Sequence, residues 1–254
     1  MDLILASLVL VAGIYLFVAL RLLTIPGALA AASMAILLFA AWGFAALVPA
    51  LTFLIFSSLW TRWPGGAKGH ERRRNLVQVL ANGLPATLLA IIEIVYHNGL
   101  WGLMMSASFA AAAADTWSTE WGRPLGGNPV SLRTVRTAPP GESGAISALG
   151  TLASMAGAAS VALSAKFAGI LDNCDTWTVL YAGLFGGIAD SLAGAWIQGQ
   201  WISASGTRTE VRLDAGANGQ LARGVTWVDN NAVNLLAAGT GALVALLIHI
   251  VWPD

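Results

Sequence analysis

Most of this chain consists of apolar stretches that are long enough to cross a lipid bilayer. A hydrocarbon core about 30 Å thick needs about 20 apolar residues in a helix, and a helix packed inside a bundle can be shorter. We therefore expect eight transmembrane helices in an all-α, polytopic membrane bundle. The expected spans are residues 3–22, 26–41, 43–60, 76–96, 99–118, 144–165, 177–200 and 229–251.

The second and third spans need a break between them to fit a bilayer. One helix over 26–60 would reduce the number of spans to seven, but it would run about 52 Å at 1.5 Å per residue, which exceeds an ordinary bilayer. Trp42-Gly43 is the expected hinge. The first twenty residues lack the basic start and the cleavage site of a secretory signal. We expect them to remain as a helix of one integral membrane domain over residues 1–254.

The overall composition agrees with a membrane protein and argues against several other classes. Hydrophobic residues make up 57% of the chain and charged residues 10%, which is unusual for a soluble domain. The single cysteine, Cys174, excludes an intramolecular disulfide, and no cysteine cluster suggests zinc. The formal net charge is zero, so a nucleic acid is not an expected partner.

The basic residues predict the orientation of the chain, because Lys and Arg in short loops stay in the cytoplasm. With eight spans, Lys166 alone of the thirteen basic residues falls on the outer face. Both termini would then lie outside, and the three long loops, 61–75, 119–143 and 201–228, would share the cytoplasm. The sequence therefore predicts an active site that faces the cytoplasm.

Four acidic residues lie near this predicted cytoplasmic face: Asp115, Glu120, Asp190 and Asp229. A charge inside the apolar zone costs about 2.5–3.5 kcal/mol on insertion scales, so an acid within a membrane helix suggests a functional site. The similarity between FAAAAADT (109–116) and FGGIADS (185–191) places Asp190 in a position that corresponds to Asp115. The structural alternatives are that Glu120 marks the water boundary, that Asp115 pairs with a neighbouring arginine, and that Asp229 caps the eighth helix.

Amide side chains accompany the acids at helical spacing. Gln78 and Asn82 follow Asn75 at i+3 and i+7, and so form one stripe at the inner end of the fourth helix. Asn231 and Asn234 repeat the arrangement on the eighth helix. The two stretches align as NLVQVLANG and NAVNLLAAG, which hints at an internal duplication.

Carboxylate and amide oxygens that converge at one face are the surroundings that Mg²⁺ prefers. We therefore expect a magnesium site among the four acids. Magnesium usually takes one or two carboxylates and completes its shell with water and substrate phosphates, so it need not bind all four. None of the three histidines lies among these acids. A His-ligated transition metal or a histidine general base is therefore not expected.

Two cytoplasmic loops contain basic and glycine-rich segments that suit phosphate. TRWPGGAKGHERRRN (61–75) contains five basic residues, and SLRTVRTAPPGESG (131–144) contains two arginines. Arginine can donate two parallel hydrogen bonds to phosphate oxygens, and lysine supplies a mobile charge. The second loop ends in Ser143 and Gly144 at the start of the sixth helix, where free backbone N–H groups attract an anion. Neither loop is a GxxxxGK[ST] motif. The alternative for Arg72 to Arg74 is contact with anionic lipid head groups.

These segments, in this order, resemble a known membrane family. The matching stretches are SSLWTR (57–62), Lys68, QVLANG (78–83), ADTWSTEWG (114–122), RTVRTAPPGESGAISALGTLA (133–153), GGIADSLAGAWIQ (186–198) and RGVTWVDNNAVN (223–234). The chain resembles the family that contains plant and cyanobacterial phytyl-phosphate kinase and the animal transmembrane protein 19 group. That family is similar, more distantly, to CTP-dependent dolichol and phytol kinases. The loop 201–222 departs from many relatives because it lacks their Cys and His residues.

The resemblance implies a phosphotransferase. It would transfer the γ-phosphoryl group of a nucleoside triphosphate, with CTP favoured, to a membrane isoprenoid monophosphate such as phytyl phosphate, giving the diphosphate. The implied partners are this lipid, the nucleotide, Mg²⁺ and membrane lipids. An acceptor that is already a phosphate supplies its own anionic nucleophile, so catalysis reduces to positioning and neutralisation of charge. This fits a site without histidine.

The implied roles divide between acids and phosphate-binding residues. Asp115, Glu120 and Asp190 would be catalytic, and together with Asp229 they would provide the metal site. The residues expected to bind or orient phosphates are Lys68, Arg62, Arg133, Arg136, Ser143, Gly144, Asn82, Gln78, Asn231 and Asn234. The prenyl chain could enter between helices lined by small residues such as GLFGG (183–187), although small side chains also simply pack helices closely.

Other functions are compatible with the same polar residues. A CTP-dependent lipid cytidylyltransferase or a polyprenol kinase would use similar groups, and a membrane transporter also has polar residues inside helices. A non-catalytic scaffold is a further alternative. A permeation path needs polar residues across the whole membrane, whereas most here fall in the predicted cytoplasmic half. Glu93, near the outer end, is the main exception.

Overall fold

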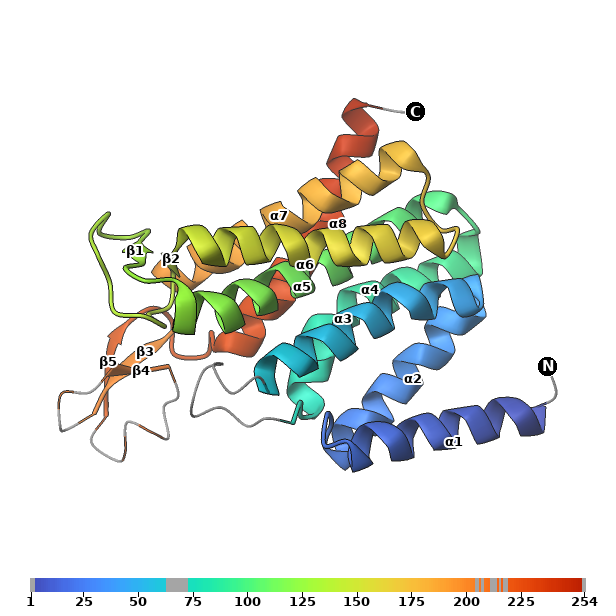
Figure 1. Cartoon of the computed structure of the whole chain (residues 1–254), viewed down its shortest axis with the longest axis horizontal. Helices are drawn as coiled ribbons and strands as arrows, with labels where there is room; N and C mark the ends of the chain where they lie inside the picture. Colours follow the sequence, from blue (N-terminus) through green and yellow to red (C-terminus); the bar gives the residue numbers. More distant parts are fainter. Residues whose placement is uncertain are drawn as a thin grey trace.

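The computed structural model describes residues 3–62, 73–203, 206, 208–210, 214, 216 and 219–252. Over these residues the chain forms eight helices (Figure 1). They are α1 (Leu3–Ala19), α2 (Ile25–Trp42), α3 (Phe44–Arg62), α4 (Leu76–Tyr96), α5 (Gly99–Leu125), α6 (Ala148–Phe167), α7 (Asn173–Trp196) and α8 (Asn230–Val251). Within this part of the chain, α2, α3, α4, α6, α7 and α8 are long and apolar enough to span a membrane. The predicted all-α membrane bundle is confirmed.

Local sequence signals set the ends of the helices. The hydroxyl of Thr24 caps α2 by accepting a hydrogen bond from Gly27 N at 3.2 Å. Gly43, with a φ of 67°, separates α2 from α3, as the predicted hinge requires. Several boundaries differ from the expectation, and α7 begins and ends four residues earlier than the expected span 177–200. α5 continues to Leu125, and α6 begins only after its N-cap, Ser147.

α5 is the central helix of the bundle. It packs against α3, α4, α6, α7 and α8, and every residue from 102 to 114 is buried. The GLFGG segment of α7 approaches it closely, because a Cβ built on Gly186 would lie 2.3 Å from the Cβ of Ala111. These small residues therefore serve close packing between helices. The alternative idea, that a lipid chain enters beside them, is not supported.

Large apolar side chains are exposed on the outer faces of the surrounding helices. Examples are Ile25 on α2, Phe185 on α7 and Leu247 on α8, each more than half exposed. Apolar surface of this extent marks contact with another apolar phase, and in this bundle that phase is lipid.

Short β-strands connect the helices at one end of the bundle. β1 (Val130–Ser131) pairs antiparallel with β2 (Ala145–Ile146), and β3 (Gln200–Ile202) pairs antiparallel with β4 (Arg208–Thr209) and β5 (Gln220–Arg223). Both sheets lie at the end where α5 finishes and α6 begins (Figure 1). The sequence analysis expected only loops here, because strands of two to four residues are too short to show a periodic pattern.

Candidate active site

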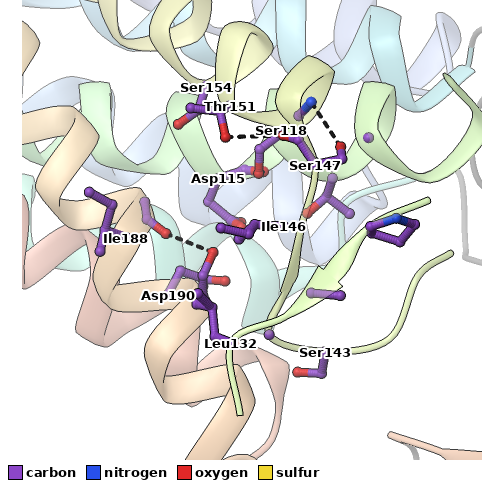
Figure 2. Close-up of a pocket in the computed structure, with 18 of the residues that line it drawn as sticks. Asp115, Ser118, Leu132, Ser143, Ile146, Ser147, Thr151, Ser154, Ile188 and Asp190 are labelled. Carbon is purple, nitrogen blue, oxygen red and sulfur yellow. Dashed lines mark hydrogen bonds between the residues drawn. The ribbon is translucent and has the colours of Figure 1, made fainter. Parts of the chain in front are cut away.

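A cavity of about 490 Å³ lies between α5, α6 and α7 and the segment that contains β1 and β2. Figure 2 shows side chains from these elements converging on it. Carboxylates and hydroxyls dominate its polar lining, which comprises Asp115, Ser118, Thr119, Arg123, Glu142, Ser143, Ser147, Thr151, Ser154, Asp190, Ser191, Gln198, Glu210 and Asn230. The cavity therefore brings together residues from four of the stretches that were quoted for the family resemblance.

One face of α5 supplies much of this lining. Asp115, Ser118, Thr119, Gly122 and Arg123 follow one another at i, i+3, i+4, i+7 and i+8, and all five line the cavity. The sequence analysis did not select Arg123 as a site residue. Its helical spacing from Asp115 is the signal that identifies it.

The carboxyl groups of Asp115 on α5 and Asp190 on α7 meet in this cavity (Figure 2). Each carboxyl group lies close enough to influence the charge of the other. Asp190 Oδ1 is buried and has no hydrogen-bond partner among the described residues. Two carboxylates at such close range repel each other unless a proton or a cation lies between them. The pair is therefore suited to binding a cation, and the sequence echo between the two helices correctly indicated their parallel placement.

The same cavity is bordered by groups that attract anions. Arg123 lines it and interacts electrostatically with Asp115. The N-terminus of α6 also borders it, where Ser147 accepts a hydrogen bond from Gly150 N at 3.1 Å. A helix N-terminus favours negative charge through its free N–H groups and its dipole. The cavity thus combines an acidic pair with two features that can hold a phosphate.

Ser143 and Gly144, two of the predicted site residues, line the cavity in the turn before β2. Gly144 has a φ of 77°, and a Cβ on it would lie 2.5 Å from the backbone of Ala195 on α7. Only glycine fits this position without displacing the turn. Ser143 Oγ donates a hydrogen bond to Gln198 Oε1 at 2.7 Å. The turn is therefore held firmly against the end of α7.

Arg223, at the end of β5, ties the same turn to α7. Its Nη2 donates to the backbone oxygen of Ser143 at 3.0 Å, and its Nη1 donates to the backbone oxygen of Ala195 at 3.1 Å. Its Nε donates to Gln200 Oε1 at 2.8 Å. The sequence analysis gave Arg223 no role beyond membership of a matching stretch. In the structure it is a positioning residue for the cavity wall.

Replacing Arg223 by methionine should loosen this wall. The variant loses three hydrogen bonds from a charged group, and each such bond contributes about 1.5–3 kcal/mol. We expect amide hydrogen exchange over residues 143–146 to accelerate at least about tenfold, since about 1.4 kcal/mol corresponds to a factor of ten. Arg136→Met, in the same segment but exposed, is the matched control and should leave this exchange unchanged. Equal exchange in both variants would contradict the positioning role.

Glu120 and Asp229 do not join Asp115 and Asp190, so the expected cluster of four acids is wrong. Glu120 is five residues beyond Asp115, which turns it about 140° around the helix. Its Oε1 accepts a hydrogen bond from Thr61 on α3 at 2.9 Å. Asp229 caps α8, where its Oδ1 accepts from Ala232 N at 2.9 Å. Within the described residues, no group of three or more His, Cys, Asp or Glu side chains is placed to hold one metal ion.

The arginines predicted to bind phosphate do not line the cavity. Arg133 and Arg136 are exposed in the segment between β1 and β2, and Arg62 is the last residue of α3. Lys68 lies outside the described residues. Spacing in a loop does not reveal which side chains turn inward, so the sequence could not separate these arginines from Arg123.

The predicted amides of α4 also lie outside this cavity. Gln78 and Asn75 form a capping box at the start of the helix. Asn82 is buried, and its Nδ2 donates to the backbone oxygen of Gln78 at 2.9 Å. Gln78 and Asn82 instead border a second cavity.

On α8, the amide that lines the cavity is one position before the predicted Asn231. Asn231 Nδ2 donates to Asp229 Oδ2 at 3.2 Å, and so supports the helix cap. Asn234 Oδ1 accepts from Asn230 Nδ2 at 3.5 Å. Asn230, which the sequence analysis did not select, is the amide from this helix that lines the cavity.

Comparisons with known proteins agree with a membrane protein of this kind. The sequence pattern described as integral membrane protein DUF92 matches residues 8–242. An uncharacterised membrane protein of Methanocaldococcus jannaschii is 31% identical over 237 residues, which cover 90% of this chain and 87% of that protein. No solved structure matches.

Two plant proteins are more distantly similar. The chloroplast protein VTE6 of Arabidopsis thaliana is 24% identical over 184 residues, covering 72% of this chain and 49% of VTE6. Protein PGR of the same plant is 28% identical over 193 residues, covering 65% of each chain. The present chain thus spans about half the length of VTE6.

Proposed function

Because this chain belongs to the integral membrane protein family DUF92, we propose that it is a kinase that acts on an isoprenoid monophosphate within the membrane. It would transfer the γ-phosphoryl group of a nucleoside triphosphate, with CTP favoured, to a phytyl-phosphate-like acceptor. The family resemblance given by the quoted motifs supports this reaction class. The observation that carries the proposal is the cavity that joins Asp115 and Asp190 to Arg123 and to the N-terminus of α6.

Mg²⁺ is the cofactor that we propose for this cavity. The buried, unpartnered Oδ1 of Asp190 and the nearby carboxyl of Asp115 fit a divalent cation. Magnesium usually takes one or two carboxylates and fills its remaining positions with water and phosphate oxygens, so two acids suffice. When bound, the ion would neutralise charge on the phosphoryl group that is transferred.

The remaining polar groups would hold the phosphates of the nucleotide. Arg123 can form two parallel hydrogen bonds to phosphate oxygens, and the first turn of α6 offers backbone N–H groups. The turn at Ser143 and Gly144 closes the wall beside them. Positioning of this kind is most of what phosphoryl transfer requires from a protein.

The proposed step needs no general base. A phosphate monoester is mostly a dianion at neutral pH, because its second pKa is about 6. One of its oxygens attacks the γ-phosphorus and forms a new P–O bond. The bond from the γ-phosphorus to the β–γ bridging oxygen breaks, and its electron pair leaves with the nucleoside diphosphate. No proton is transferred in this step.

An assay of the purified protein in detergent tests the proposal. It would contain Mg²⁺, either phytyl or geranylgeranyl monophosphate or, in a parallel reaction, the free alcohol, and CTP, ATP, GTP or UTP, with lipid alcohol, monophosphate and diphosphate resolved. We expect lipid diphosphate and nucleoside diphosphate in equal amounts, formed fastest with CTP. Release of pyrophosphate would indicate a cytidylyltransferase, and phosphorylation of the free alcohol would indicate a polyprenol kinase. Folded protein that forms no lipid diphosphate would contradict the proposal.

Transport receives less support from the polar residues. Glu93 was the acid that could have extended a polar path toward the outer end. Its Oε2 accepts a hydrogen bond from Asn98 N at 3.0 Å, at the junction between α4 and α5. Glu93 thus closes a helix end locally, and the acids Asp115 and Asp190 share a cavity at the opposite end of the bundle.

A further inference from the structure

A second cavity, of about 270 Å³, lies among α1, α2, α3 and α4. These four helices form the lower part of the view in Figure 1, whereas α6 and α7 form the upper part. The wall is almost entirely apolar, with residues such as Phe17, Leu38, Leu54 and Phe109. Arg74, Gln78 and Asn82 are its polar exceptions. The sequence analysis did not anticipate a cavity here.

The polar end of this cavity is at Arg74, beside the start of α2, and the two amides follow along the α4 wall as far as the level of Met34. Gln78 and Asn82 belong to the first two turns of α4, and Arg74 directly precedes that helix. Along α2 the wall continues from Ala28 to Leu38, a distance of about 15 Å at 1.5 Å per residue. That is about half of a hydrocarbon core about 30 Å thick, or the depth of one leaflet. The cavity therefore has a charged group at one end, a mostly apolar wall and the length of a single lipid chain.

Arg74 is fixed at the polar end by its backbone and by its ring contact. Its N–H donates to Leu22 O at 3.0 Å, and its own backbone oxygen accepts from Thr24 N at 3.1 Å. The guanidinium lies 5.1 Å from the centre of the Phe53 ring. Its Nε is buried and has no hydrogen-bond partner among the described residues. A half-buried guanidinium whose buried Nε is an unused donor is suited to an anionic ligand.

Arg74 also connects the two cavities. Burial lowers the pKa of Arg74 from its ordinary value, and the charges of Glu120 and Asp115 act in the opposite direction. Asp115 lines the first cavity and Arg74 lines the second. An anion at Arg74 would therefore lie close to the acids of the first cavity. Asn82 is 3% exposed, and its unpartnered Oδ1 is an acceptor, so Arg74 is the group in this wall that attracts an anion.

We propose that the second cavity binds the hydrocarbon chain of an anionic lipid, with the head group of the lipid against Arg74. The choice of an isoprenoid monophosphate as this lipid rests on the proposed function. The lipid would then enter from the α1–α4 side, and the nucleotide would occupy the polar cavity on the other side of Asp115. The two substrates would then have separate sites that meet at Asp115.

Filling the cavity with a larger side chain tests where the hydrocarbon chain of the lipid binds. Ala35 lines it, whereas Ala40 lies on the same helix but faces outward. Each buried methylene contributes about fourfold to affinity, so a phenyl ring in the cavity should cost at least about tenfold. We expect Ala35→Phe to bind geranylgeranyl monophosphate at least about tenfold more weakly than the wild type, measured by displacement of radiolabelled lipid without nucleotide. Ala40→Phe should stay within about twofold.

Changing the charge tests where the head group binds. Arg74→Gln should weaken binding of geranylgeranyl monophosphate about tenfold and leave binding of the uncharged alcohol geranylgeraniol unchanged. Arg74→Lys, which keeps the charge, should retain most of the affinity. Equal losses for the phosphate and the alcohol would overturn the head-group assignment. Thermal unfolding of each variant in detergent checks that the protein remains folded.

The outcomes separate this inference from the proposed kinase activity. If Ala35→Phe forms lipid diphosphate at the wild-type rate and binds lipid with wild-type affinity, the inference is wrong and the kinase proposal stands. If the wild type binds lipid but forms no diphosphate, and Ala35→Phe loses the binding, the result would support the cavity as the lipid site and contradict the kinase. A diacyl phosphatidic acid that competes as well as the isoprenoid phosphate would overturn the assignment to a single isoprenoid chain.

Discussion

Asp115→Asn is expected to lower the rate of lipid diphosphate formation by about 10²–10³, the loss typical when one preorganised electrostatic contact is removed from an active site. The amide keeps the shape of the side chain but removes the charge that would hold a cation beside Asp190. Asp190→Asn should cause a similar loss. The double variant should be little worse than either single variant, because groups that act as a unit are not additive. The measurement is steady-state turnover with saturating nucleotide and isoprenoid phosphate.

The structure offers a control with the same chemical change. Asp229→Asn replaces an acid that caps α8, and asparagine caps helices as well as aspartate does. This variant should keep turnover within about twofold of the wild type. A large loss in Asp229→Asn, or full activity in Asp115→Asn, would contradict the assignment of the acidic pair.

Gly186→Ala is expected to produce the largest loss of stability. A Cβ at this position would lie 2.3 Å from the Cβ of Ala111 and 2.8 Å from the backbone oxygen of Ala237. The α5, α7 and α8 helices would have to move apart to relieve these contacts. Overpacking in a tight core costs about 1–3 kcal/mol, and we expect the upper end or more because backbone is involved. Thermal unfolding in detergent, followed by tryptophan fluorescence, measures the effect.

Gly239→Ala is the matched control on α8. No atom lies within 4 Å of a Cβ built there, and alanine is favoured over glycine inside a helix by about 0.8–1.0 kcal/mol. The control should therefore unfold at the same temperature as the wild type or slightly higher. Equal destabilisation by the two substitutions would show that the close approach at Gly186 does not govern the stability of the bundle.

The helices were largely predictable because each one is defined by its own residues. Apolar length predicted the spans, and Gly43 predicted the break between α2 and α3. The cap of α8 at Asp229 was also considered from sequence, since an acid before an apolar run is a local signal. The short strands β1 to β5 were missed, because two to four paired residues carry no readable period.

The candidate site was predictable only in part. Asp115 and Asp190 were found from their helical context, and Ser143 and Gly144 from their place before α6. Glu120 was assigned to the wrong group because its position on the helix surface was not worked out from its five-residue separation from Asp115. Arg133 and Arg136 were chosen over Arg123 because loop residues show no periodicity that would reveal the direction of a side chain.

The sequence by itself determined that this chain forms a membrane helical bundle with acids at one end, since hydrophobic length and local capping act within each segment. Only the tertiary structure decided which polar groups share a cavity. The rotation of each helix about its own axis depends on contacts between distant segments, such as Gly186 against Ala111. Hydropathy carries no information on that rotation. For the same reason, the apolar cavity beside Arg74 exists only once α1 to α4 have packed.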